Sequence, residues 1–190
     1  MRKQIIKFLF LLLAFGYAME AKSSHFTVDG IWYSYTNEDD DEVGVIYNKS
    51  GEYSGDVVIP STVTYNGKQY TVTKINAGAF LLDSALTAVT IPNSMTSIDS
   101  HAFQGCSNLK KVIWNARNVQ DFQDNSRRPF SGCDRLTDFV FGDEVEHIPD
   151  YLCYNLTSLK NLVIGNSVTS IGNRAFYSCT SLTEVSIPNS

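Results

Sequence analysis

Cysteine and histidine are the side chains of this sequence with the most reactive chemistry. Cys106, Cys133 and Cys179 each follow a phenylalanine by three residues, whereas Cys153 stands where such a phenylalanine would be. A zinc site needs closely spaced ligand pairs such as C-x₂-C or H-x₃-H, and the sequence contains neither. Free cysteine packs as a small hydrophobic side chain, so we predict packing for these positions. A disulfide between Cys106 and Cys133 is the alternative if neighbouring repeats stack.

The three histidines give no indication of catalysis. His25, His101 and His147 lie in unrelated sequence contexts, and Ser-His-Asp or Cys-His chemistry would need a fold that brings such groups into one pocket. The sequence has no H-E-x-x-H, no G-x-S-x-G and no glycine-rich phosphate loop. We therefore predict a protein that is not an enzyme and that uses no cofactor and no metal.

An acidic run at residues 38–42 is a candidate for cation binding. Its carboxylates are the kind of oxygen ligand that Ca²⁺ prefers. The run lacks the spaced acidic residues and the glycine of a calcium-binding loop, and charged loop tips usually stay solvated. We expect a solvated tip, with calcium binding as the alternative.

Composition and charge narrow the class of protein. Hydrophobic residues make up 43% of the 190 residues, which is enough apolar surface for a folded core. Fifteen Lys and Arg residues stand against 20 Asp and Glu residues, which gives a formal net charge of −5. A nucleic-acid-binding protein would normally carry an extended basic patch. We therefore predict no nucleic-acid partner.

The N-terminus has the pattern of a secretory signal peptide. Arg2, Lys3 and Lys7 precede an apolar run at residues 8–15, and small residues follow it. The run is too short to span a bilayer, which takes about 20 residues. We predict a signal peptide at residues 1–21, with cleavage after Ala18 or a buried N-terminal helix as alternatives. The mature chain, without a transmembrane segment, would be secreted or held at the cell surface.

An internal repeat organises the rest of the chain. One column of equivalent positions holds an aromatic residue in all copies but one, and a second column holds leucine in all of them. The members of the two columns are Phe80, Phe103, Phe130, Cys153 and Phe176, and Leu86, Leu109, Leu136, Leu159 and Leu182. Both columns have spacings of 23, 27, 23 and 23 residues. Residues 72–190 are therefore predicted to form five repeats of about 23 residues.

Each repeat predicts one short strand and a return segment. The pattern L-x-x-V-x-I is that of a leucine-rich repeat, and its apolar residues can be buried only when successive copies stack. The segment A-F-x-x-C reads as a short helical or 3₁₀ turn on the return side. The predicted fold is therefore mainly β, a leucine-rich-repeat solenoid with parallel strands and short helical or 3₁₀ return turns.

Residues 22–71 predict a β-rich cap in front of the repeats. Asp29-Gly30 and Asn66-Gly67 are two-residue hairpin turns between strand-like segments. The economical interpretation is a hairpin cap that covers the apolar end of the first repeat. At the other end the sequence stops within the pattern, so we expect an array that is open, part of a longer one, or paired end to end.

The final repeat resembles a known family. Residues 168–190 read V-T-S-I-G-x-x-A-F-x-x-C-x-S-L-T-x-V-x-I-P-N-S, which closely resembles the BspA-like leucine-rich repeats of bacterial surface and secreted proteins. The resemblance covers residues 72–190 and extends to the lead-in at residues 55–70. It implies a solenoid displayed outside the cell, often as an adhesin or host-interaction module.

The candidate binding residues lie on the outward side of the predicted strands. In L-x-x-V-x-I, the residues between the inward ones face away from the core. These outward candidates are Lys111, Ile113, Asp138, Val140, Asn161, Val163, Glu184 and Ser186. Ile113, Val140 and Val163 would form an apolar stripe that anchors an extracellular protein, with Lys111 and Asp138 setting its orientation. Alternatively, β-branched residues simply suit strands.

Three further readings stay open at this point. The longest repeat contains an insertion at residues 123–129, where Arg127 and Arg128 could contact an acidic glycan or protein. Trp32, Tyr33 and Tyr35 could stack on sugar rings and make the protein a glycan-capturing surface protein. Because these aromatic residues alternate along one strand, at least one of them is expected in the core. The chain could also be a structural spacer within a longer surface protein.

Overall fold

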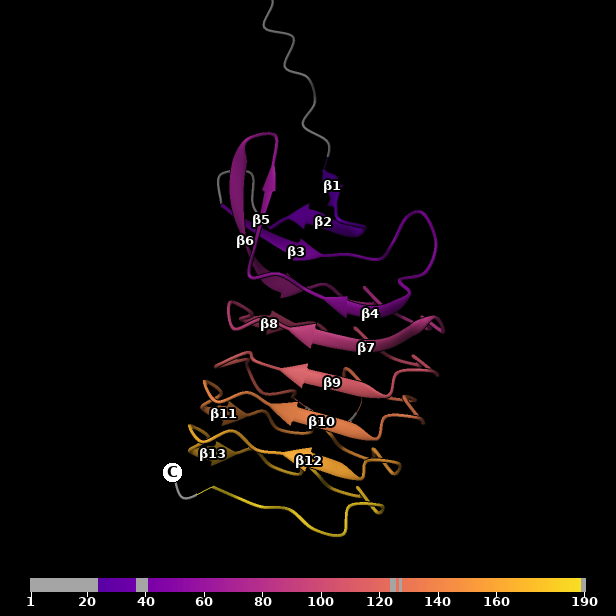
Figure 1. Ribbon diagram of the computed structural model, residues 1–190, viewed down its shortest axis with the longest axis vertical. Coiled ribbons are helices and arrows are strands. Elements are labelled where there is room, and N and C mark those ends of the chain that lie inside the picture. The colour runs from indigo at the N-terminus through magenta and orange to yellow at the C-terminus, as the bar shows by residue number, and fades with distance from the viewer. Residues whose placement is uncertain (1–23, 37–40, 124–125, 127, 189–190) are drawn as a thin grey trace, which may run out of the picture.

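The protein is a stack of parallel β-coils with an antiparallel cap. The computed structural model describes residues 24–36, 41–123, 126 and 128–188, and it contains no helix in that part of the chain. Figure 1 shows the cap at one end and successive coils below it. The predicted fold class, a mainly β leucine-rich-repeat solenoid, is confirmed.

Five parallel strands form the front sheet, which is the broadest surface of the solenoid. Its order is β12-β10-β9-β7-β4. The strands are β4 (Gly55–Val58), β7 (Leu86–Ile91), β9 (Lys111–Trp114), β10 (Asp138–Phe141) and β12 (Asn161–Val163). Val112 pairs in register with Val89 on one side and Phe139 on the other, and all three are completely buried. The leucine-rich pattern therefore fixes which side chains face the core.

A second set of short parallel strands forms the side column. It comprises β3 (Glu42–Val45), β6 (Lys68–Ile75), β8 (Ser97–Ile98), β11 (His147–Ile148) and β13 (Ser170–Ile171). β6 pairs with β3 and β8, and β11 pairs with β13. The coil with the insertion forms no strand between β8 and β11, although its Val119 and Phe122 stay buried. The insertion thus interrupts the column's hydrogen bonding but not its packing.

The return side is held by a stack of aromatic rings. Phe80 lies 4.7 Å from Phe103 between ring centroids, and Phe103 lies 5.0 Å from Phe130, with nearly parallel planes. Tyr53 extends the stack to the coil above, 4.6 Å from Phe80. Each of these rings is at most 3% exposed. Stacking in this way buries every ring against the equivalent position of the next coil.

The return segments are hydrogen-bonded turns, so the prediction of short helical or 3₁₀ pieces there is wrong. Alternate N–H groups leave the coil: Phe80 N donates to Ala102 O and Leu82 N to Gln104 O of the next coil. Each coil also places a residue with positive φ at the position of Leu82, for which Gly105 is the equivalent. A right-handed helix accommodates neither feature, because it needs negative φ and internal hydrogen bonds.

The cap joins the solenoid instead of only covering it. β1 (His25–Val28) and β2 (Ile31–Tyr35) form one hairpin, and β5 (Thr62–Tyr65) forms the other with β6. The two predicted turns are present, with φ of 49° and 80° at Asp29 and Gly30 and of 50° and 77° at Asn66 and Gly67. β3 continues the side column and β4 continues the front sheet, so residues 42–59 form a coil ahead of the first repeat.

Aromatic side chains make up the centre of the cap. Phe26 stacks on Tyr65 at 4.3 Å between centroids and lies within 5.7 Å of Tyr33, Tyr35 and Tyr70. These contacts bring β1 beside β5, the two outer strands of the cap sheet, as Figure 1 also shows. The aromatic cluster of the cap belongs to the same continuous hydrophobic core as the coils.

The last segment does not form the expected strand. Residues 182–188 have no regular structure, and Val185 and Ile187 are 38% and 63% exposed. The L-x-x-V-x-I pattern of the last repeat predicts a strand here, but a strand also needs a hydrogen-bonded neighbour. The front sheet ends instead at β12, which pairs with β10 alone among the described strands.

The aromatic stack predicts a specific stability effect. Phe103→Ala should lower the free energy of unfolding by about 3–5 kcal/mol, because it leaves a cavity between two coils. Gln104→Ala, at the next and partly exposed position, is the matched control and should cost less than about 1 kcal/mol. Urea unfolding followed by circular dichroism measures both. A loss at Phe103 no larger than at Gln104 would show that the stack does not hold the coils together.

Candidate binding face

The outward side chains of the front sheet form two straight columns, which we call the binding face. Strand pairing aligns Lys111 with Asp138 and Asn161, as predicted from the repeat register. It aligns Ile113 with Val140 and Val163 in the same way. Val163 is 53% exposed, while Ile113 and Val140 are half-buried by their neighbours in the sheet. The three apolar side chains of the predicted stripe therefore lie side by side on adjacent strands.

The polar column carries a fixed negative charge at its centre. Asp138 accepts hydrogen bonds from Thr137 Oγ1 at 2.5 Å and from Asn161 Nδ2 at 2.7 Å. The bond from Thr137 lowers the pKa of Asp138 most, and Asn161 and the positive charge of Lys111 lower it further against partial burial. The carboxylate is thus held ionised beside the apolar stripe, in a defined orientation.

The face extends further toward the cap than the sequence pattern indicated. Asp56 of β4 pairs with Ala88, and Val58 pairs with Thr90, so these residues continue the two columns. Val58 is 65% exposed. The segment lies before the first recognisable repeat, so the repeat pattern does not reveal it. The signal was its ending in Ile59-Pro60, as β7 ends in Ile91-Pro92.

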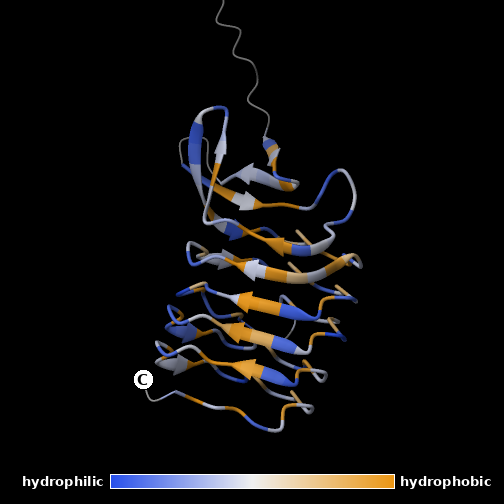
Figure 2. Cartoon of the chain, in the orientation of Figure 1, coloured by the Kyte–Doolittle hydropathy of each residue, from blue (hydrophilic) through white to orange (hydrophobic). Residues whose placement is uncertain are grey.

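Basic residues gather at the start of the strands. Lys110, Arg135 and Lys160 line a hollow of about 450 Å³. Asp134 and hydroxyls such as that of Thr137 complete its lining. Figure 2 shows hydrophilic residues where β9, β10 and β12 begin and hydrophobic residues where they end. Along β9, β10 and β12 the face therefore changes from hydrophilic to hydrophobic side chains.

Two of the predicted face residues lie off the sheet. Glu184 and Ser186 are exposed, but they belong to the irregular segment 182–188. Their expected alignment with Asn161 and Val163 is therefore wrong, because the strand that would carry them is not formed.

Arg128 of the insertion contacts the next coil. Arg128 stacks over the ring of Tyr154 at 4.8 Å and donates a hydrogen bond from Nη1 to Tyr154 O at 3.1 Å. These contacts brace the inserted coil against the next one and leave Arg128 half-buried. Arg127 lies outside the described residues.

The predicted sugar-stacking aromatics do not share a surface. Tyr33 is 1% exposed and belongs to the cap core, so it presents no open ring face. Tyr35 is half-buried against Phe26 and Tyr70. Trp32 lies on the opposite side of β2, where its ring is 5.6 Å from that of His25. The three residues therefore do not form a stacking platform, and the expectation that at least one is core is met.

All four cysteines are buried free thiols. Cys106 Sγ donates to Phe80 O at 2.9 Å, Cys133 Sγ to Phe103 O at 3.1 Å, and Cys179 Sγ to Cys153 O at 3.1 Å. The neighbouring Cys133 and burial raise the pKa of Cys106, and burial raises that of Cys153 and Cys179. The thiols thus pack and link coils, and their chemistry is suppressed.

Asp83 occupies the cysteine position in the first repeat, where it accepts a hydrogen bond instead of donating one. Its Oδ2 accepts a hydrogen bond from Tyr53 N at 2.8 Å, and Oδ1 has no partner among the described residues. The residue is 4% exposed, and this burial is the main cause that raises its pKa. The coil above presents the N–H of Tyr53 here, so the residue at this position must accept a hydrogen bond. In later repeats the coil above presents a carbonyl, to which the cysteine thiol donates.

The structure brings together a serine, a histidine and an aspartate that the sequence reading treated as unrelated. His147 Nδ1 lies 2.7 Å from Ser170 Oγ, and His147 Nε2 lies 2.7 Å from Asp121 Oδ1. They come from equivalent positions of three successive coils. Ser170 is exposed on the outside of β13, where nothing in the described structure excludes water from a reacting group. The arrangement is a polar link between coils.

The described end of the acidic run, Asp41 and Glu42, makes polar contacts with β6. Asp41 pairs with Lys68 at 2.6 Å, and Glu42 Oε2 accepts a hydrogen bond from Thr73 at 3.0 Å. The rest of the tip, residues 38–40, lies outside the described residues. Within the residues that the structure describes, no three His, Cys, Asp or Glu side chains are grouped to hold a metal, and no helix is long and apolar enough to cross a membrane.

Two parallel strand columns, a short repeat and an aromatic return stack define a leucine-rich-repeat solenoid. The family model described as BspA type leucine rich repeat region matches residues 73–190 in six copies. The chain therefore belongs to the BspA-type leucine-rich repeat family. Proteins of this family are bacterial surface or secreted proteins.

Solved structures of bacterial proteins share this fold. A leucine-rich cell surface protein of Faecalibacterium prausnitzii is 26% identical with a TM-score of 0.50, over 86% of this chain and 48% of that one. The chain thus spans about half of that protein. A leucine-rich repeat protein of T. pallidum is 26% identical with a TM-score of 0.58, and the match covers 83% of this chain and 68% of that one. A leucine-rich repeat protein of Eubacterium ventriosum is 20% identical, with a TM-score of 0.57. The match covers 87% of this chain and 46% of that one, and at this identity it shows the fold alone. No curated protein matches the chain.

The Asp121–His147 link predicts a pH dependence of stability. Partial burial raises the pKa of Asp121, but hydrogen bonds from Asp150 N and His147 outweigh it and leave the pKa lowered. A lowered carboxyl pKa stabilises the fold above the ordinary value of about 4, and this contribution is lost as the pH falls through the lowered value. Asp121→Asn should therefore reduce the thermal midpoint at neutral pH, and the difference should shrink as the pH falls toward about 3 and below.

Thermal unfolding of both proteins across this pH range measures the effect. Asp134→Asn removes an exposed carboxylate outside the link and serves as the control. A difference between Asp121→Asn and the parent protein that stays constant with pH would contradict this account of the link.

Proposed function

We propose that this protein is an exported recognition module that binds a protein partner outside the cell through the binding face, in adhesion or host interaction. The observation that carries the proposal is an outward column on the parallel sheet, exposed at both ends and half-buried between them: Val58, Thr90, Ile113, Val140 and Val163. Membership in a family of surface and secreted proteins supports a binding role over a catalytic one.

The chemistry of the face favours a protein partner. Apolar side chains in the middle of a patch and charged side chains at its border are the usual composition of a protein interface. Ile113 and Val163 would be the central anchors, with Lys111 and the oriented carboxylate of Asp138 at the border. A sheet whose inward residues are fully packed presents these groups with little entropy to lose on binding.

Glycan capture is less well supported than protein binding. It was based on Trp32, Tyr33 and Tyr35, and only Trp32 keeps a partly open ring away from the cap core. A spacer role within a longer surface protein is compatible with the fold but leaves the exposed apolar column without a use.

The face can be tested by changing its charge. Ile113→Glu combined with Val163→Glu should reduce capture of the partner at least about 100-fold, because two buried contacts become buried charges. Both side chains point away from the core, so the thermal midpoint should change little. The measurement is a binding titration against a panel of purified extracellular proteins, with a glycan array run in parallel.

A matched control tests whether any exposed apolar residue would give the same result. Leu81→Glu combined with Ile171→Glu changes two side chains that are 48% and 42% exposed on other sides of the solenoid. This control should bind normally. Equal loss in both variants, or binding confined to the glycan array, would contradict a protein-binding front sheet.

Export is tested separately from binding. The proposed signal peptide predicts that the exported protein begins at Lys22, after removal of 21 residues. Mass spectrometry of the protein recovered from the culture medium and the cell surface identifies its N-terminus. Recovery of the uncleaved chain from the cytoplasm alone would rule the proposal out.

A further inference from the structure

A cleft separates the cap from the upper edge of the front sheet. It has a volume of about 640 Å³, within the range of pockets that bind small groups. Its walls are the turn between β1 and β2, the loop before β4, β4 itself and β5. Because Asp56 and Val58 line both the cleft and the binding face, the two are continuous.

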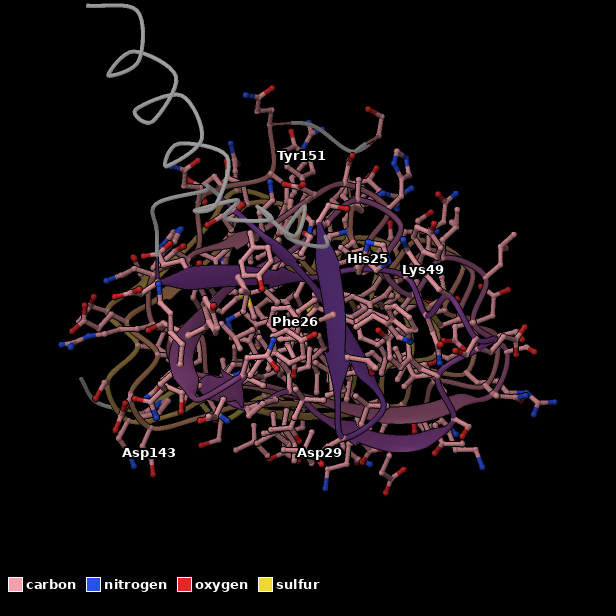
Figure 3. All side chains as sticks on the ribbon, turned by 90° about the horizontal axis from the view of Figure 1, so that it is seen from above. His25, Phe26, Asp29, Lys49, Asp143 and Tyr151 are labelled. Carbon is pink, nitrogen blue, oxygen red and sulfur yellow. The ribbon has the colours of Figure 1, made fainter. Side chains whose placement is uncertain are left out.

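The cleft is acidic. Asp29, Glu52 and Asp56 contribute carboxylates, and no Lys, Arg or His side chain is among the described residues that line it. Glu52 accepts a hydrogen bond from Ser84 at 3.0 Å and Asp56 from Thr87 at 2.7 Å, which orients both groups. Asp29 stands at the hairpin turn, and Figure 3 places it at the edge of the molecule opposite Tyr151. Such a cleft attracts a cation.

Tyr33 is the most deeply buried of the residues that line the cleft. The residue lines the cleft and is 1% exposed, and its ring is fixed against Phe26 at 5.5 Å. The hydroxyl makes no hydrogen bond within the part of the chain that the structure describes, and it does not count among the fully buried atoms there, of which Asp83 Oδ1 alone lacks a partner. Burial, then the nearby Tyr53 and Asp29, raises the pKa of Tyr33, so the group stays protonated. A hydroxyl that opens onto the cleft and makes no hydrogen bond within the described residues can bond to a ligand that enters.

β4 offers a free strand edge beside the same cleft. Gly55 N and Ile59 N donate to Ala85 O and Thr90 O, so alternate backbone groups face β7. The groups of Asp56 and Val58 face the other way, where no described strand pairs with β4. A free edge of this kind binds an extended peptide by adding it as another strand.

We propose that the cleft and the free edge of β4 together bind an extended basic segment of the protein partner, with a Lys or Arg side chain entering the cleft toward Asp29 and Tyr33. The edge supplies backbone hydrogen bonds, and the cleft supplies selectivity for positive charge. This inference rests on the proposed protein-binding function and names the part of the partner that reaches the cap.

The probe is a short capped peptide in which Lys and Val alternate, titrated against the full protein. The same peptide with Glu in place of Lys should not bind. Free N-acetyl-lysine methylamide and N-acetylglucosamine separate a peptide site from a site for an isolated cation or a sugar. Binding of the Lys peptide should weaken as salt increases, because carboxylates recognise it.

Two conservative variants identify the groups. Tyr33→Phe removes only the hydroxyl and should weaken the Lys peptide about five-fold, the loss expected for one hydrogen bond. Asp29→Asn should weaken it about ten-fold, because a charged hydrogen bond is lost. Asp134→Asn, a carboxylate beside the hollow at the opposite end of the face, is the control and should leave affinity unchanged.

The outcomes separate this proposal from the function on which it rests. Unchanged affinity in Tyr33→Phe and Asp29→Asn, equal binding of the Glu peptide, or equal binding of the free amine or sugar would each overturn it. The Ile113→Glu and Val163→Glu protein should still bind the Lys peptide while it loses the partner. A parent protein that captures its partner through the face but binds no Lys peptide overturns the cleft proposal and leaves the face standing.

Discussion

The stacking of equivalent positions between coils is the constraint on which the rest of this structure depends. A single coil of about 23 residues is too small to enclose its own apolar side chains, so each coil must be covered by the next. Phe80, Phe103 and Phe130 are buried because each lies against its own equivalent. The backbone follows the same rule, since N–H groups of the return turns donate to the coil below. Register is therefore preserved even through the coil that carries the insertion.

This constraint separates the residues that can vary from those that cannot. The inward positions of the front sheet must fill a narrow space between coils, and Val112, Trp114 and Phe139 are fully buried there. The outward side chains do not fill the space between coils, so their chemistry is free to suit a partner. The charge of these side chains changes along the face, from acidic groups near the cap to basic groups around Lys110 and Arg135. A partner of complementary charge would be held in one direction.

The junction between cap and repeats shows what happens when the coil above changes. In the repeats a thiol donates to a carbonyl, but at Asp83 the neighbour presents Tyr53 N, and a carboxylate accepts it. Tyr53 itself continues the phenylalanine stack, and its hydroxyl donates to Ile46 O and accepts from Trp32 N. One residue thus belongs to the solenoid by its ring and to the cap by its hydroxyl, which joins the two parts.

Periodicity of the sequence determined the repeat length and the inward and outward residues of β7, β9, β10 and β12. Two-residue turn sequences determined the two hairpin turns of the cap. These features follow from local spacing, because period-two alternation and Asn-Gly or Asp-Gly turns act over a few residues. The tertiary structure decided the conformation of those segments whose hydrogen bonds depend on a neighbouring coil. The return segments became turns because their N–H groups bond across coils, and residues 182–188 stayed irregular without strand pairing. The Asp121–His147–Ser170 link and the acidic cleft at Tyr33 join residues from separate coils or hairpins, and no single repeat contains enough of either to reveal it.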